Sequence, residues 1–442
     1  MISRRSFAKL AVRSGIAAAT APLWKSAVCA KAFAQLPISY KALVVITLEG
    51  GNDGNNVLIP LDASTYAQYS ALRSAVALPQ SACHVLNSAA GSPSYGLHPS
   101  LVNVAALYNA GSAAVIANVG PIARPATKSQ ILQNPDLIPP ALMSHPAGVN
   151  QWESATMEAL PTTGWGGRIA DLIASQSGSL PPVFDAAGES IFTVGRSVQA
   201  ISVNVGGGPA SPQSAGLQQA MLEIAQNDAL SENQIIARAA ALRIQALNDQ
   251  ALISQAQSSA APLRTTFPTS GFGQAMQAIA SIINGRDAIG ATRQIFYAQQ
   301  GIYDTHQNQM GTHASYLSEL DGGLGALMSA LQEMGLSDQV LVCTHSDFNR
   351  TFIANTAAGT DHAWGNHQLV LGGGIRGGRI IGSFPDLDLG GSMDFNGYGI
   401  WIPTISACQM AAGMGNWMGL SASQLGQVFP DLANFPNGAI AL

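Results

Sequence analysis

The chain has 442 residues, of which 47% are hydrophobic and only 10% are charged, and its formal net charge is −5. So many apolar residues can bury a sizeable core, which excludes a disordered chain. The weak acidic charge provides no basic surface for nucleic acid or for an anionic membrane. We therefore expect a large globular protein that binds no nucleic acid.

The first 34 residues predict an export signal. Arg4 and Arg5 form a twin-arginine pair, followed by a weakly apolar stretch and an A-x-A cleavage pattern at 32–34. A basic helix of the folded protein is the weaker alternative. The apolar stretch is too short for a stable membrane span, and no later stretch is long enough. We expect the twin-arginine translocase to export the chain, leaving residues 35–442 as a soluble periplasmic or secreted domain.

Beyond the signal, the sequence alternates between strand and helix patterns. Continuous apolar runs predict buried strands, and alanine-rich or amphipathic stretches predict helices. The predicted strands are 43–48, 113–119, 292–299, 339–344 and 368–371, and the predicted helices are 102–109, 217–257 and 316–334. The alanine- and glutamine-rich stretch predicts a mainly helical insertion around 205–265, and 206–212 is expected to form a flexible loop.

A glycine-rich motif follows the last of these strands. Residues 372–377 match G-x-G-x-x-G, the pattern of a dinucleotide-binding turn. A dinucleotide fold requires a helix after this turn, but residues 378–382 continue as another strand pattern. We interpret the motif as a glycine hairpin turn.

Five of the eight histidines lie between residues 304 and 367, and four of them form three clusters with aspartates. The clusters are Asp304 with His306, His345 with Asp347, and Asp361 with His362 and His367. Any one such pair is commonly a polar turn or a satisfied histidine. Parallel strands, however, bring their carboxyl ends to one edge of a sheet, and imidazole with carboxylate is a metal-binding combination. The three clusters together predict a metal site.

Six motifs carry a resemblance to a known family. They are residues 48–56 (LEGGNDGNN), 96–99 (GLHP), 164–168 (GWGGR), 304–306 (DTH), 344–351 (THSDFNRT) and 359–367 (GTDHAWGNH). Together they resemble the exported bacterial family known as domain of unknown function 1501. That family is itself distantly similar to the alkaline phosphatase and sulfatase superfamily. The resemblance implies an alkaline-phosphatase-like α/β fold, with a mainly parallel sheet flanked by helices and one or two metal ions at its carboxyl edge.

The resemblance also implies roles for individual residues. The positions similar to metal ligands are Asp53, Asp304, His306, Asp347 and His362, with Asp361 and His367 as further ligands or as partners that orient them. Asp347 stands where the family usually has glutamate, which shortens the reach of the carboxylate. For Asp53 the alternative is a turn residue in Asn-Asp-Gly, and for His367 it is a cap at the end of a helix or strand.

The superfamily also uses a nucleophile at the start of a helix, where backbone N–H groups stabilise an anion. The resemblance assigns this catalytic position to Ser144 with His145, although residues 146–152 depart from the family's usual continuation. A plain loop serine is the alternative, with Thr127 as another candidate nucleophile. Lys128 and Arg168 could bind an anionic substrate, and Arg168 equally fits a structural ion pair.

The function implied is that of an exported metal-dependent hydrolase acting on small anionic phosphate or sulfate esters. Zinc is the expected divalent metal, with calcium, magnesium or manganese as alternatives. The competing hypothesis is a non-catalytic, metal-stabilised protein of the cell envelope with a binding or assembly role.

Replacing both Arg4 and Arg5 by lysine should leave the precursor in the cytoplasm, because the translocase recognises the arginine pair. Cell fractionation and immunoblotting would measure the distribution. Arrival of the variant in the periplasm at the normal rate would contradict the export prediction.

Overall fold

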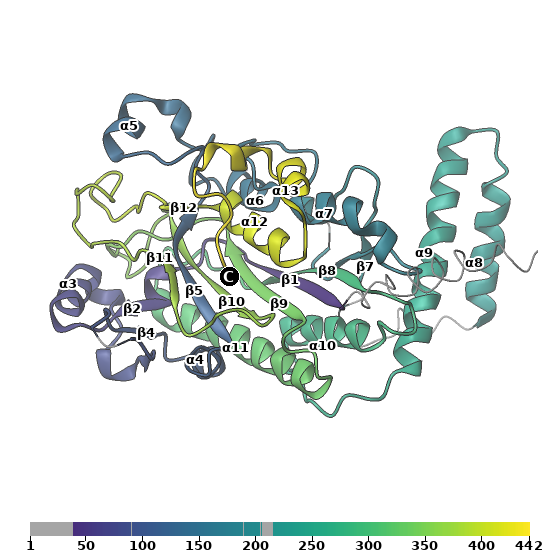
Figure 1. Cartoon of the computed structure of the whole chain (residues 1–442), viewed down its shortest axis with the longest axis horizontal. Coiled ribbons are helices and arrows are strands. Elements are labelled where there is room, and N and C mark those ends of the chain that lie inside the picture. The colour runs from purple at the N-terminus through teal and green to yellow at the C-terminus, as the bar shows by residue number, and fades with distance from the viewer. Residues whose placement is uncertain (1–38, 90, 189, 204, 206–214) are drawn as a thin grey trace, which may run out of the picture. The chain divides into compact units, whose positions relative to one another are not determined.

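The computed structural model describes residues 39–442 apart from 90, 189, 204 and 206–214 (Figure 1). The predicted signal peptide and the predicted loop at 206–212 lie outside the described residues. Within the described part of the chain, no helix has the length and apolar character needed to cross a membrane.

A nine-stranded mixed sheet forms the centre of the described domain. Its strands lie in the order β11-β5-β10-β9-β1-β8-β6-β7, and β12 pairs with β5. The strands are β1 Lys41–Leu48, β5 Ala113–Gly120, β6 Val183–Asp185, β7 Ile201–Ser202, β8 Arg293–Gln300, β9 Val340–Ser346, β10 Asn366–Gly372, β11 Ile380–Gly382 and β12 Ile405–Ser406. Only β10 runs antiparallel to its neighbours in this sheet. The predicted fold class, a mainly parallel sheet flanked by helices, is therefore confirmed.

The helices cover both faces of this sheet (Figure 1). They are α3 Ala63–Arg73, α4 Val102–Asn109, α5 Lys128–Gln133, α6 His145–Ser154, α7 Trp165–Ile173, α8 Ala215–Asp228, α9 Gln234–Ser259, α10 Gly271–Asn284, α11 Gln309–Glu333, α12 Ala407–Trp417 and α13 Ala422–Val428. The alternating side chains of β1 show the two layers. Val44 packs with α4, α10 and α11 on one face, and Val45 packs with α6, α7, α12 and α13 on the other.

Smaller elements complete the domain. A three-stranded antiparallel sheet joins β2 Leu58–Pro60, β4 Tyr95–Leu97 and β3 His84–Val85, in that order. In the region of the predicted helical insertion, α8 and α9 pack against each other. Helix α9 begins after Asn233, whose side chain accepts hydrogen bonds from the N–H groups of Ile235 and Ile236.

Two elements differ from the sequence prediction. The glycine run 372–374 does not close a hairpin, because β11 pairs in parallel with β5 instead of with β10. Its three glycines have positive φ, which lets the chain leave β10 and pass to the far side of β5. A strand still follows the run, as predicted, so the dinucleotide motif lacks its helix. Helix α11 begins at Gln309, seven residues before the predicted start at 316.

The register of the parallel strands brings their carboxyl ends together. Leu48 at the end of β1 pairs with Gln300 of β8 on one side and with Ser346 of β9 on the other. The loops that follow these three strands therefore start at one edge of the sheet. The glycines after β1 let these loops approach closely, since a Cβ on Gly50 would lie 2.8 Å from the backbone N of Asp304.

Three histidines are buried near this edge. Burial lowers the pKa of His98, His313 and His345 from 6.5 to about 3 in each case. The His345 imidazole contacts the Thr47 hydroxyl at 2.9 Å and stacks on Trp152. These rings are therefore neutral in the folded protein near neutral pH.

The buried histidines predict loss of stability in acid. As the pH falls below 6.5, the unfolded chain takes up protons on these rings while the folded chain does not, so the free energy of unfolding falls between about pH 6.5 and pH 3. With three rings the slope is at most roughly 4 kcal/mol per pH unit. His345→Gln should reduce this slope by about 1.4 kcal/mol per pH unit. Urea unfolding at several pH values measures it, and stability that stays constant between pH 7 and pH 5 would contradict the prediction.

Candidate metal site

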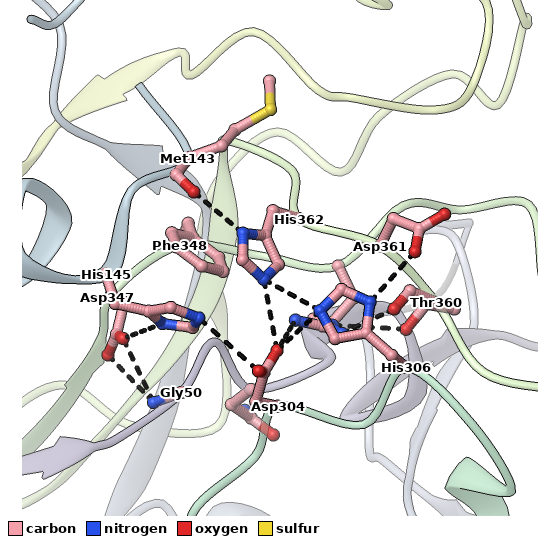
Figure 2. Close-up of polar contacts among 12 residues, drawn as sticks. Gly50, Met143, His145, Asp304, His306, Asp347, Phe348, Thr360, Asp361 and His362 are labelled. Carbon is pink, nitrogen blue, oxygen red and sulfur yellow. Dashed lines mark hydrogen bonds and ion pairs between the residues drawn. The ribbon is translucent and has the colours of Figure 1, made fainter. Parts of the chain in front are cut away.

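The candidate site lies at the carboxyl edge of the sheet, where four segments meet (Figure 2). Asp304 and His306 follow β8, Asp347 directly follows β9, and Asp361 with His362 precedes β10. His145 is the first residue of α6. The sequence predicted the first five of these residues as metal ligands and His145 as a catalytic residue, and the structure brings all six together.

Three imidazoles surround the carboxylate of Asp304. The Nε2 atom of His306 lies 2.9 Å from Oδ1 of Asp304, and that of His362 lies 3.1 Å from the same oxygen. The Nε2 atom of His145 approaches Oδ2 at 3.6 Å. Ligand atoms of His145, Asp304 and His362 all lie within 4.8 Å of one another. Asp304 and His306 are partly exposed, with 36% and 44% of their side-chain surfaces accessible, so solutes can reach the cluster.

Each imidazole is oriented through its other nitrogen. The Nδ1 atom of His145 contacts Asp347 at 2.7 Å, and that of His306 contacts Asp361 at 3.0 Å. The Nδ1 atom of His362 lies 2.8 Å from the carbonyl oxygen of Met143. An acceptor at Nδ1 fixes the proton there and leaves the Nε2 lone pair free, which is the usual arrangement of metal-binding histidines.

These contacts distinguish the predicted ligands that orient histidines from the one that lies at the centre of the cluster. Asp347 is completely buried, and its carboxylate is occupied by His145 and by the N–H of Gly50, 3.1 Å from both oxygens. Asp361 contacts His306 and the side-chain amide of Asn355. Both aspartates are thus placed to orient histidines, whereas Asp304 is placed at the centre.

Arg350 holds Asp304 in position. Its guanidinium is fully buried and donates to Oδ1 of Asp304 at 2.8 Å and to the carbonyl oxygen of Thr360 at 2.5 Å. Burial opposes ionisation of Asp304, but the hydrogen bond from Arg350 and the nearby His362 ring outweigh it and lower the pKa of this carboxyl. The carboxylate at the centre of the cluster is therefore ionised at neutral pH.

The pKa values of two of these histidines shift in opposite directions. The hydrogen bond to Asp347 raises the pKa of His145, and burial lowers the pKa of His362. Phe348 packs against both rings, at centroid distances of 4.8 Å and 4.4 Å. This packing requires a glycine at position 51, where a Cβ would lie 2.5 Å from the Phe348 ring.

Asp53, predicted as a bridging ligand, lies in a different setting. Its fully buried carboxylate forms an ion pair with Arg73 and accepts hydrogen bonds from the side-chain amide of Gln309 and the N–H of Asn55. It also caps the short 3-10 helix Gly54–Asn56. The turn-residue alternative describes these contacts better than the ligand assignment does.

His345 and His367 belong to the sheet. His367 lies within β10, and its Nδ1 accepts a hydrogen bond from the N–H of Asn118 in β5 at 3.0 Å. Its ring stacks on Phe384, and burial lowers its pKa to about 4. Because β10 runs antiparallel, His367 stands at the start of that strand and not at a carboxyl end. Its contacts are those of a core histidine, and its role as a ligand stays a prediction.

The predicted nucleophiles and the predicted anion-binding residues differ in the hydrogen bonds that their side chains make. Ser144 is the N-cap residue of α6 and makes no side-chain capping hydrogen bond. Thr127 forms a capping box with Gln130, and Lys128 donates to the carbonyl oxygens of Gly390 and Gly391.

Arg168 is buried within the fold. Its guanidinium donates to the carbonyl oxygens of Ser154, Thr163 and Val428. Its hydrogen-bond partners are thus mainly backbone oxygens, which corresponds to neither the predicted ion pair nor a free anion-binding group.

The donor set around Asp304 fits a metal ion. The Nε2 atoms of His306 and His362 lie only 3.0 Å apart, although both rings already use Nδ1 for an acceptor. Two lone pairs this close repel each other unless a proton or a cation lies with them. Imidazole nitrogens suit zinc and similar transition metals better than calcium or magnesium, which prefer oxygen ligands.

Sequence reasoning missed the two buried arginines. Arg350 lies inside the motif at 344–351, three residues after Asp347, and a positive charge so close to a predicted acidic ligand was an available signal. Arg73 lies twenty residues after Asp53, at the end of helix α3, which was not predicted. No sequence pattern marks this arginine.

Comparisons with known proteins give a family and distant structural likenesses. No curated protein matches the chain. Among solved structures it is similar to the phosphonate monoester hydrolase of Agrobacterium radiobacter, with 9% identity, a TM-score of 0.37, and coverage of 86% of this chain and 74% of that one. It is also similar to a protein in the alkaline phosphatase superfamily from Vibrio parahaemolyticus, with 11% identity, a TM-score of 0.34, and coverage of 87% and 67%.

A third similar structure is the PsFucS1 sulfatase from Pseudoalteromonas sp., with 10% identity, a TM-score of 0.32, and coverage of 79% of this chain and 65% of that one. At such scores, these likenesses assign neither a reaction nor a metal to this chain. The family model is a different kind of finding, because it matches residues 40–394, which include the whole Asp304 cluster. The chain therefore belongs to the family described as protein of unknown function, DUF1501.

Proposed function

We propose that the protein is an exported metal-dependent hydrolase that acts on phosphate or sulfate esters. The observation that carries this proposal is the convergence of three oriented Nε2 atoms on the ionised carboxylate of Asp304. A cluster of this kind at the carboxyl edge of an α/β sheet is where such folds commonly place their active sites.

His145, Asp304, His306 and His362 would hold the ion, and zinc is the metal that these donors favour. Bound there, a divalent ion would supply positive charge to stabilise negative charge that develops on oxygen. Asp347 and Asp361 would keep the imidazoles in the binding tautomer, and Arg350 would keep Asp304 ionised and in place.

Ser144 is the group we assign to nucleophilic attack. It immediately precedes His145, so a substrate oxygen at the cluster would also lie near the start of α6. The hydroxyl is not used to cap the helix, which leaves it available to react. The N–H groups of His145 and Ala147 in the first turn of α6, where Pro146 offers none, would then stabilise the anionic ester.

A structural metal site is the second candidate, and the number of donors favours it. Three imidazoles and one carboxylate equal the four protein ligands of a closed structural zinc site, whereas catalytic sites commonly keep a position open. The exposure of Asp304 and His306 favours the catalytic alternative. Export, and therefore a periplasmic or secreted location, rests on the twin-arginine sequence at Arg4 and Arg5.

Two substitutions separate binding from catalysis. His362→Ala should remove metal and activity together, because it deletes one donor. Ser144→Ala should retain the metal and the fold but lower kcat by at least about a hundredfold, because it deletes only the attacking group. Hydrolysis of aryl phosphate and aryl sulfate esters, with metal content measured on the same samples, tests both expectations.

Ser254→Ala, on an exposed part of α9, is the matched control and should behave as the wild type. Full activity of Ser144→Ala would reassign the attack to water or to Thr127. Tight metal binding without hydrolysis of any ester by the wild type would favour the structural role.

A further inference from the structure

Two carboxylates, the partly exposed Asp304 and the buried Asp53, are each paired with a buried guanidinium. Asp304 accepts from Arg350, and Asp53 forms an ion pair with Arg73, and the side chains of both arginines are fully inaccessible to solvent. The three imidazoles with oriented Nδ1 atoms, however, lie only around Asp304 among the contacts of the described residues. The two carboxylates are therefore not equivalent as metal sites.

The surroundings of Asp53 leave its oxygens occupied. Oδ2 accepts from Arg73 and from the side-chain amide of Gln309, and Oδ1 accepts from the N–H of Asn55 at 3.2 Å. The Arg73 guanidinium is itself fixed by the carbonyl oxygens of Thr351 and Phe352. A metal ion at Asp53 would have to displace the buried guanidinium of Arg73. The carbonyl oxygens that hold this guanidinium could not reach water in its place, so the exchange would be costly.

The charge of the cluster matches that of one divalent ion. The cluster contains three carboxylates, those of Asp304, Asp347 and Asp361, and one guanidinium, that of Arg350, so it carries a net charge of −2 when its histidines are neutral. One divalent cation balances this charge, whereas two would leave an excess of positive charge in a partly buried site. The Asp53–Arg73 pair is already neutral.

We propose that the protein binds one divalent ion, at Asp304 and its three histidines, and that Arg73 takes the place of a second ion at Asp53. This inference rests on the metal site of the proposed function but not on its hydrolytic activity. In it, Asp53 and Arg73 form a structural ion pair outside the metal ligands, and Gln309 connects Asp53 to Thr360, whose carbonyl oxygen holds Arg350.

The test is the metal stoichiometry of purified protein loaded with zinc. After dialysis, mass spectrometry should find one zinc per chain in the wild type and in Asp53→Asn, since the amide can still accept from Arg73 and Gln309. Isothermal titration should give the two proteins the same Kd within about twofold. Asp304→Asn, the matched control at the other carboxylate, should weaken binding by more than about tenfold.

Should Asp53→Asn fail to fold, the neutral double variant Asp53→Asn with Arg73→Gln replaces it, and thermal melting monitors the fold of each. Two zinc ions in the wild type, or loss of an ion in either Asp53 variant, would overturn the inference. One ion per chain without ester hydrolysis would contradict the proposed hydrolase and leave the single-ion site standing. A wild type that binds no divalent ion would contradict both.

Discussion

The hydrogen bond between the buried Arg350 guanidinium and Asp304 is the interaction on which the candidate site depends. It helps to lower the pKa of the central carboxyl, and the ionised carboxylate can bind a cation together with the three neighbouring imidazoles. Without Arg350, burial would raise the pKa of Asp304 and weaken its attraction for a metal. The cost of burying a guanidinium is offset only because Asp304 and the carbonyl oxygen of Thr360 both receive its hydrogen bonds.

The same interaction joins the site to the interior of the fold. Thr360 donates through its hydroxyl to Gln309, the first residue of α11, and Gln309 donates to Asp53. Asp53 in turn follows β1, the central strand whose neighbours β8 and β9 carry the loops of Asp304 and Asp347. Cluster, helix and sheet are therefore connected by one series of buried polar contacts. Such networks are rigid when every member is satisfied, which suits a site whose donors must stay in place.

Sequence alone was sufficient for strands β1, β5, β8, β9, β10 and β11 and for the meeting of the aspartate-histidine clusters, but the short strands β6, β7 and β12 were not predicted. Strands β1 and β5 are mainly apolar because both of their faces are covered, and this pattern can be read from the sequence. The direction of β10 was not predictable, because it depends on pairing with β9 and β5 and not on composition. That direction is why His367 stands in the sheet although His362, five residues earlier, reaches the cluster.

The division of roles within the cluster also required the structure. Asp304, Asp347 and Asp361 are alike in sequence, and only their contacts show that one lies at the centre while two orient histidines. His145 came from the resemblance as a catalytic residue, but its Nε2 atom points at Asp304 as the other two imidazoles do. The ion pair that occupies Asp53 joins residues twenty positions apart, and no motif connects them.

X-ray diffraction from crystals grown with zinc, recorded at the zinc absorption edge, tests the central claim most directly. We expect one anomalous peak at the cluster, about 2.0–2.2 Å from the Nε2 atoms of His145, His306 and His362 and from Asp304. An anomalous peak at Asp53, or no peak at the cluster in zinc-loaded crystals, would contradict it.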